Sequence, residues 1–100
     1  MTRDEIFAAI IAERARQDEK HPVAFYALMA NDANREKISD LAIAFKIIND
    51  TQESNKEHNA YNLLSEEFFE FFAETDKARQ VEEAIQNAAL WVRIIEEITK

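Results

Sequence analysis

Apolar residues recur every three or four positions along most of the chain, with charged and amide residues between them. This spacing is typical of amphipathic helices. Near the N-terminus it predicts a helix to about Lys20, with Ile6 and Ile10 on its apolar stripe. Glu13 and Gln17 continue the angular position of that stripe, so this end of the helix either projects beyond the core or borders a polar cavity.

The same spacing predicts three further long helices and one short helical stretch. The long ones cover residues 33 to about 49–51, residues 54 to about 75, and residues 77–98. Capping boxes at residues 2–5 and 54–57 mark the expected starts of the first and third long helices. Residues 23–29 are apolar and predict one or two additional helical turns.

The composition favours an all-α fold. The chain has 100 residues, no glycine and a single proline, and helix-forming residue types dominate it. Sheets with tight hairpins normally need glycine or Asn-Gly turns, which this chain lacks. We therefore expect residues 1–100 to form a single domain, a compact bundle of four main helices with one short extra turn.

The charge and the apolar pattern limit the classes of partner and compartment. A net charge of −8 is opposite to the basic surface that nucleic-acid polymers and anionic membranes require. No apolar run reaches membrane-spanning length, and the N-terminal residues lack the apolar core of a signal peptide. The absence of cysteine excludes disulfides and thiolate metal sites and suits a reducing compartment. We expect a cytoplasmic protein.

Two acidic clusters in the C-terminal half carry candidate chemistry. Residues three apart share a face of a helix, so Glu67 and Glu70 can converge from one helix, and Glu83 and Gln86 can converge from the next. Carboxylate and amide oxygens are the ligands that a hard divalent cation prefers. The pattern therefore suggests a Mg²⁺ site between two adjacent helices.

An alternative interpretation of these acids is structural. Glu67 falls between Leu63 and Phe71 on the apolar arc of its helix, where a carboxylate is costly unless it is paired, hydrogen-bonded or bound to a metal. Lysine or arginine partners would satisfy that need without a ligand. The cations near these clusters in the sequence are Lys77, Arg79 and Arg93.

Three segments, in the same order along the chain, carry a resemblance to a known family. They are ERARQDEK at residues 13–20, LLSEEFFE at residues 63–70 and EEAIQNAA at residues 82–89. Together they resemble the all-α nucleoside triphosphate pyrophosphohydrolases of the MazG-like superfamily, whose signature is Glu-Glu-x-x-Glu, a variable gap, and Glu-x-x-Asp. The gap from Glu70 to Glu83 is at the short end for that family.

The resemblance implies a specific activity. Such a protein hydrolyses a canonical or modified nucleoside triphosphate to the monophosphate and pyrophosphate, with Mg²⁺ or Mn²⁺, as a homodimer or homotetramer. It implies that Glu67, Glu70 and Glu83 are metal ligands and that Glu66 is a ligand or orients the attacking water. Phosphate-binding cations are also implied, and the candidates are Arg14, Arg16, Lys20 and Arg93.

One position departs from the family pattern. Gln86 stands where the signature has its final aspartate, so the site has one negative charge fewer. Metal affinity would be lower, or Glu74 or Asp76 would replace the missing acid, or the site would bind without hydrolysis. The alternative functions are a catalytically degenerate MazG-like module that binds nucleotide or a protein partner, and an unrelated acidic helical protein.

Overall fold

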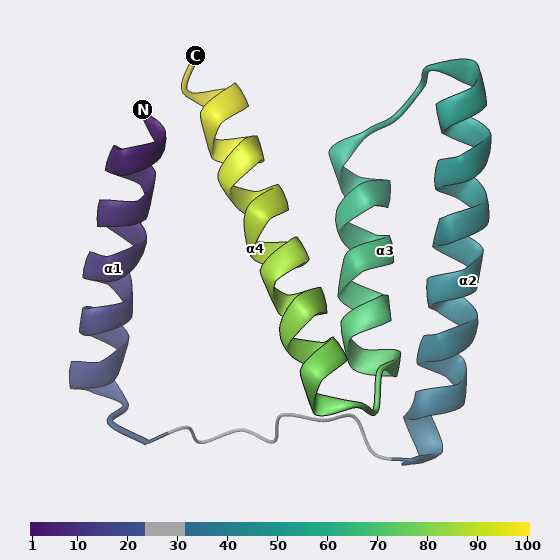
Figure 1. The fold of residues 1–100 in the computed structure, drawn as a ribbon, viewed down its shortest axis with the longest axis horizontal. Helices are drawn as coiled ribbons and strands as arrows, with labels where there is room; N and C mark the ends of the chain where they lie inside the picture. The colour runs from purple at the N-terminus through teal and green to yellow at the C-terminus, as the bar shows by residue number, and fades with distance from the viewer. Residues whose placement is uncertain (24–31) are drawn as a thin grey trace. The chain divides into compact units, whose positions relative to one another are not determined.

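The computed structural model describes residues 1–23 and 32–100, and it confirms the all-α prediction (Figure 1). The helical turns expected at residues 23–29 lie outside the described residues, except for Val23. None of the described helices is long and apolar enough to cross a membrane. Four helices form in the described ranges: α1 (Arg3–Lys20), α2 (Asp32–Asn55), α3 (Ala60–Ala73) and α4 (Lys77–Ile98).

The chain divides into two units, with the boundary within α4. The first unit contains α1 and the residues from Trp91 onward. A hydrogen bond joins the two termini of the chain in this unit: the N-terminal ammonium group donates to the hydroxyl oxygen of Thr99 at 2.9 Å. Among the described residues of this unit, the buried side chains are Ile6 and Val92.

The ends of α1 follow from its sequence as predicted. The Thr2 hydroxyl accepts from the backbone N–H of Glu5 at 3.2 Å, and the Glu5 carboxylate accepts from the backbone N–H of Thr2 at 2.8 Å. This reciprocal pair is a capping box. The helix ends at Lys20, and His21 precedes Pro22, which disfavours helical backbone in the residue before it.

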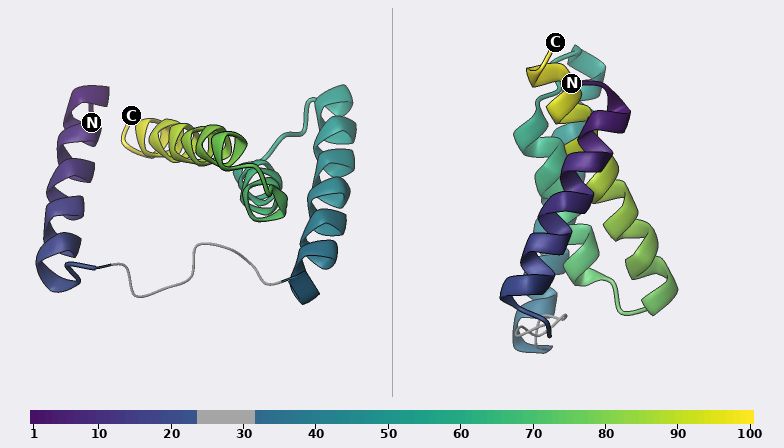
Figure 2. Two further views of the ribbon diagram at one scale, coloured as in Figure 1. Left: turned by 60° about the horizontal axis from the view of Figure 1, so that its bottom comes forward. Right: turned by 90° about the vertical axis from the view of Figure 1, so that its left-hand side faces the viewer.

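The second unit contains α2, α3 and the part of α4 up to Leu90. Helices α2 and α3 pack side by side in opposite directions (Figures 1 and 2). The rings of Phe45 and Phe69 stack between them, with centroids 5.6 Å apart. Asn49 is 4% exposed, and its side-chain nitrogen donates to the carbonyl oxygen of Asn62 at 2.9 Å, which fixes α2 against α3.

The predicted end of the second helix is wrong: α2 continues to Asn55 instead of ending at residues 49–51. Its end has the hydrogen bonds of a Schellman motif, with Lys56 N–H donating to Glu53 at 3.1 Å and Glu57 N–H donating to Gln52 at 2.8 Å. Lys56 has a positive φ of 57°, a conformation that glycine usually supplies. A helix end at a lysine carries no glycine signal, which is why the sequence pattern missed it.

The predicted capping box at residues 54–57 is also wrong. The Ser54 hydroxyl donates to the carbonyl oxygen of Asp50 at 3.3 Å, inside α2. Helix α3 begins later, at Ala60, and its cap is Asn59, whose side-chain oxygen accepts from the backbone N–H of Asn62 at 2.9 Å. Asparagine is as good a cap as serine, and here the one nearer to the apolar run is used.

Capping side chains also shape the turn between α3 and α4. The carboxylate of Glu74 accepts from the backbone N–H groups of Thr75 and Asp76 at 3.1 and 3.0 Å. The carboxylate of Asp76 accepts from the backbone N–H of Arg79 at 3.0 Å and so caps α4, as predicted. Both acids that could replace the missing aspartate of the family signature are therefore engaged in backbone hydrogen bonds.

Candidate metal centre

Three carboxylates converge in the second unit. Glu67 and Glu70 are one turn apart on α3, and Glu83 is on α4. One carboxylate oxygen from each lies within 4.8 Å of the other two, and all three side chains are half-buried. The i, i+3 spacing places the two acids of α3 on one face, and the short turn at residues 74–76 brings α4 back beside it. We call Glu67, Glu70 and Glu83 the acidic triad.

Burial and the charges of neighbouring acids disfavour the ionised forms of Glu67 and Glu70. The pKa of Glu70 is raised to about 7, first by burial and then by the charges of Glu67, Glu66 and Glu83. The pKa of Glu67 is also raised, by burial and then by the charges of Glu83 and Glu66. Glu66 thus lies close enough to act on the triad through its charge, although it is not one of the three converging ligands. A nearby positive charge would reverse both shifts.

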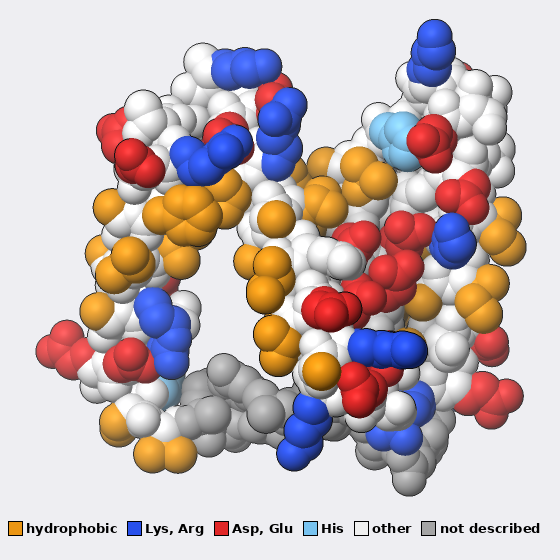
Figure 3. Space-filling view, in the orientation of Figure 1, with side chains coloured by type: hydrophobic (Ala, Val, Ile, Leu, Met, Phe, Trp, Pro, Cys, Tyr) orange, Lys and Arg blue, Asp and Glu red, His pale blue; other side chains and the backbone are white. Residues whose placement is uncertain are grey.

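No lysine or arginine charge is among the causes of the raised pKa values of Glu67 and Glu70. Arg93, one of the cations that could have neutralised the acidic triad, pairs with Glu97 on its own helix at 3.3 Å. In Figure 3 acidic side chains gather over α3 and the neighbouring part of α4. The triad thus combines three half-buried carboxylates, and no protein cation lowers the raised pKa values of Glu67 and Glu70.

Gln86, the fourth predicted ligand, lies beside two members of the triad. In the amide orientation that satisfies its hydrogen bonds, the side-chain nitrogen donates to Glu67 Oε2 at 3.0 Å and to Glu83 Oε2 at 3.2 Å. In that orientation the amide is a hydrogen-bond donor to the carboxylates. A cation would instead require the carbonyl oxygen of Gln86 to face the triad.

A cavity of about 260 Å³ adjoins the acidic triad in the second unit. Glu70 and Glu83 line it together with Lys46 of α2. The Lys46 ammonium group lies 3.4 Å from the carboxylate of Asp50, one turn along α2, and both side chains remain mostly exposed. A cation therefore faces the same cavity as two triad acids without pairing with them.

Lys46 was not among the site residues predicted from the sequence. The available signal was its spacing from Ala42, which is buried one turn earlier on α2 and lines the same cavity. That spacing places Lys46 on the side of α2 that faces the cavity. It cannot show that α3 and α4 bring acids to the other side.

The predicted phosphate-binding cations all belong to the first unit, whereas the acidic triad belongs to the second. Lys20 is in the last turn of α1. The three arginines pair with acids on their own helices. These pairs are Arg14 with Asp18 at 2.5 Å, Arg16 with Glu13 at 2.6 Å, and Arg93 with Glu97 at 3.3 Å.

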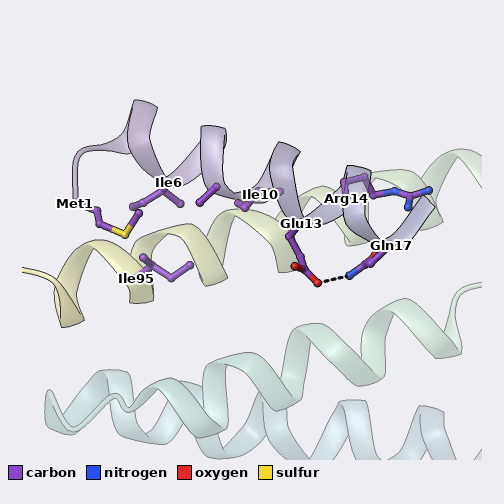
Figure 4. A pocket seen from close by; sticks show the side chains of 8 residues that line it. Met1, Ile6, Ile10, Glu13, Arg14, Gln17 and Ile95 are labelled. Carbon is purple, nitrogen blue, oxygen red and sulfur yellow. Dashed lines mark hydrogen bonds between the residues drawn. The ribbon is translucent and has the colours of Figure 1, made fainter. Parts of the chain in front are cut away.

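The first unit has a cavity of its own, about 270 Å³ in volume (Figure 4). Apolar side chains, including Ile6 and Ile95, line one part of it, and Glu13 and Gln17 line another. Gln17 donates to Glu13 at 3.4 Å, and the hydrogen bond from Arg16 is the main reason that the pKa of Glu13 falls to about 2. Glu13 and Gln17 line this cavity and are also exposed, so both alternatives for the polar end of this helix face stay open.

Comparisons of the chain with models of protein families, with curated proteins and with solved structures gave no match. The resemblance to the MazG-like superfamily therefore rests on residues 13–20, 63–70 and 82–89 alone. What the protein binds has to be inferred from the geometry of the acidic triad and of the cavity beside it.

Proposed function

We propose that the acidic triad binds Mg²⁺ or Mn²⁺ and that the protein is a MazG-like nucleoside triphosphate pyrophosphohydrolase. The observation that carries the proposal is the convergence of three carboxylate oxygens within 4.8 Å, from two helices. No lysine or arginine charge offsets the raised pKa values of Glu67 and Glu70. The family resemblance supplies the reaction. The triad is where the three acids implied by that resemblance come together.

The donor set suits a hard divalent cation. Metal–oxygen distances of about 2.0–2.1 Å for Mg²⁺ and 2.3–2.6 Å for Ca²⁺ allow two oxygens on one ion to be at most about 4.2 and 5 Å apart. The spacing of the triad oxygens is within or close to these limits. Oxygen is also the only donor type that these three side chains offer, which excludes a site built for a soft metal.

The residues around the triad have roles in this proposal. When bound, the cation would supply positive charge to the phosphate oxygens and lower the pKa of a coordinated water. Glu66, next to the triad on α3, would orient the attacking water as the family resemblance implies. Lys46, across the cavity from Glu70 and Glu83, is placed to bind a phosphate group through its ammonium.

The proposal includes a homo-oligomer, either a dimer or a tetramer. The buried apolar side chains among the described residues are few, namely Ile6, Ala42 and Val92. Val81 and Ile85, one turn apart on α4, are 59% and 62% exposed, and Trp91 is 54% exposed. Apolar surface of this kind marks association sites in soluble proteins.

A second candidate function is a degenerate module that binds nucleotide or a protein partner without turnover. One observation favours it: in the amide orientation that satisfies its hydrogen bonds, Gln86 donates to two triad carboxylates at 3.0 and 3.2 Å. An aspartate at this position would instead add a fourth carboxylate and no N–H donor. The amide partly satisfies the triad without a metal, so turnover and binding must be tested separately.

Pyrophosphate release from a panel of nucleoside triphosphates and deoxynucleoside triphosphates, with Mg²⁺, Mn²⁺ or EDTA, tests the enzyme. Glu70→Gln should abolish metal-dependent release, because it removes one triad ligand. Glu82→Gln is the matched control: it removes the same charge from an exposed residue beside Glu83 and outside the triad, so release should persist. Release that survives Glu70→Gln would refute the assigned site, and a folded protein without release would favour the binding module.

A further inference from the structure

Asn87 joins the backbones of two triad residues. It is half-buried on α4, one turn after Glu83. Its side-chain nitrogen donates to the carbonyl oxygen of Glu67 at 2.9 Å and to the carbonyl oxygen of Glu83 at 2.8 Å. Each carbonyl oxygen has two lone pairs, so it can accept this bond in addition to its helical one. One amide group therefore links α3 and α4 at the triad.

The bond to Glu67 is the informative one. The bond to Glu83 lies within α4, between residues four apart, and could form in an isolated helix. The bond to Glu67 crosses from α4 to α3, between residues twenty apart. It holds α4 at one position along α3, and that position places the Glu83 carboxylate beside those of Glu67 and Glu70.

We propose that Asn87 is a positioning residue, which sets the register of α3 against α4 and thereby holds the acidic triad together against its own repulsion. Its importance for metal binding rests on the proposed function. The positioning itself does not, because the convergence of the three carboxylates exists in the protein without a metal.

The chemistry of the amide explains why asparagine suits this position. Both partners are carbonyl oxygens, so the side chain must offer two N–H groups and carry no negative charge. An aspartate of nearly the same shape has no N–H to offer and would add another charge beside the triad. A serine can still bond to the carbonyl four residues earlier on its own helix, but it is too short to reach α3 as well.

A double-mutant cycle by urea unfolding, at pH 8 and in EDTA, tests the positioning. Glu70→Gln removes a repelled charge and should raise the urea midpoint of the otherwise native chain. In the Asn87→Ala background the carboxylates can move apart, so this rise should shrink by at least half. Asn87→Ser should behave in the same way, and it remains the test if Asn87→Ala does not fold.

Asn49→Ala is the matched control, because Asn49 also links two helices through a single side-chain nitrogen, between α2 and α3. It should lower the urea midpoint while leaving the full rise caused by Glu70→Gln. An equal rise in the native, Asn87→Ala, Asn87→Ser and Asn49→Ala backgrounds would overturn the inference, because it would show that Asn87 contributes stability and no positioning.

Mn²⁺ binding, followed by electron paramagnetic resonance, separates this inference from the proposed function. We expect the Kd for Mn²⁺ to rise at least about tenfold in Asn87→Ser and to change less than about twofold in Asn49→Ala. Coupling in the unfolding cycle without Mn²⁺ binding to the native chain would refute the proposed metal site and support the role of Asn87. Mn²⁺ binding to the native chain without coupling would support the proposed metal site and refute the role of Asn87.

Discussion

Glu70→Gln is the substitution whose effect can be worked out most fully from the structure. The pKa of Glu70 is raised from 4.5 to about 7, and burial is the largest cause. At pH 8 the folded protein therefore holds an ionised carboxylate in a place that favours the neutral form. Glutamine keeps nearly the same shape and carries no charge, so it removes this penalty.

The sign of the pH dependence follows from the two pKa values. Between pH 4.5 and about 7 the folded protein holds a proton on Glu70 that the unfolded chain has lost. The free energy of unfolding therefore falls as the pH rises through this window, and it is constant above it. Each pKa unit corresponds to 1.36 kcal/mol, which sets an upper limit of about 3 kcal/mol. Because Glu70 lines a cavity reached by solvent, screening reduces this to an expected 1–2 kcal/mol.

Urea unfolding at pH 5 and pH 8 measures the effect. In EDTA, the native chain should lose about 1–2 kcal/mol more stability between these pH values than Glu70→Gln does, and the control Glu82→Gln should resemble the native chain. Mg²⁺ or Mn²⁺ should reverse part of the loss in the native chain and in the control, but not in Glu70→Gln. Identical pH dependence in all three proteins would refute the reasoning, because it would show that folding imposes no penalty on the Glu70 carboxylate.

Three other substitutions test separate features. Lys46→Ala should weaken the binding of a nucleoside triphosphate by about tenfold, measured as KM or Kd. The Kd for Mn²⁺ should stay the same, because Lys46 faces the cavity without joining the triad. Lys56→Gly should stabilise the protein by about 0.5–1 kcal/mol in urea unfolding, since glycine adopts the positive φ of 57° without steric cost. A loss of stability would contradict this assignment of the helix end. Ile85→Glu should lower the mass measured by light scattering if the exposed apolar face of α4 is an assembly surface.

The sequence predicted helix bounds accurately where a local signal marks them. Thr2 and Glu5 form the expected capping box, Pro22 follows soon after the end of α1, and Asp76 caps α4. Each signal acts within one turn of backbone, so it needs no knowledge of the tertiary structure. The boundary between α2 and α3 lacked such a signal, because Lys56 adopts a conformation that its side chain does not favour.

The candidate site was predictable only in part. Helical spacing places Glu67 and Glu70 on one face, and this part follows from periodicity alone. The approach of Glu83 depends on the turn that reverses the chain and on the register of two helices, which Asn87 secures through a backbone oxygen on α3. Lys46 comes from a third helix. Periodicity orients residues within a helix, and it carries no information on which neighbouring helix they face.

The cost of holding the acidic triad together matters because this protein has little stability with which to offset it. Small domains bury a modest fraction of their surface, and a folded protein is stable by only about 5–15 kcal/mol. Few apolar side chains are fully buried in the described residues, so a penalty of about 1–2 kcal/mol is a substantial part of what remains. A ligand that binds the folded triad and not the unfolded chain raises the free energy of unfolding, and the increase grows with the logarithm of the ligand concentration. If the triad is a cation site, the loss of stability with rising pH and the gain with added cation must therefore arise from the same carboxylates, and Glu70→Gln must reduce both together.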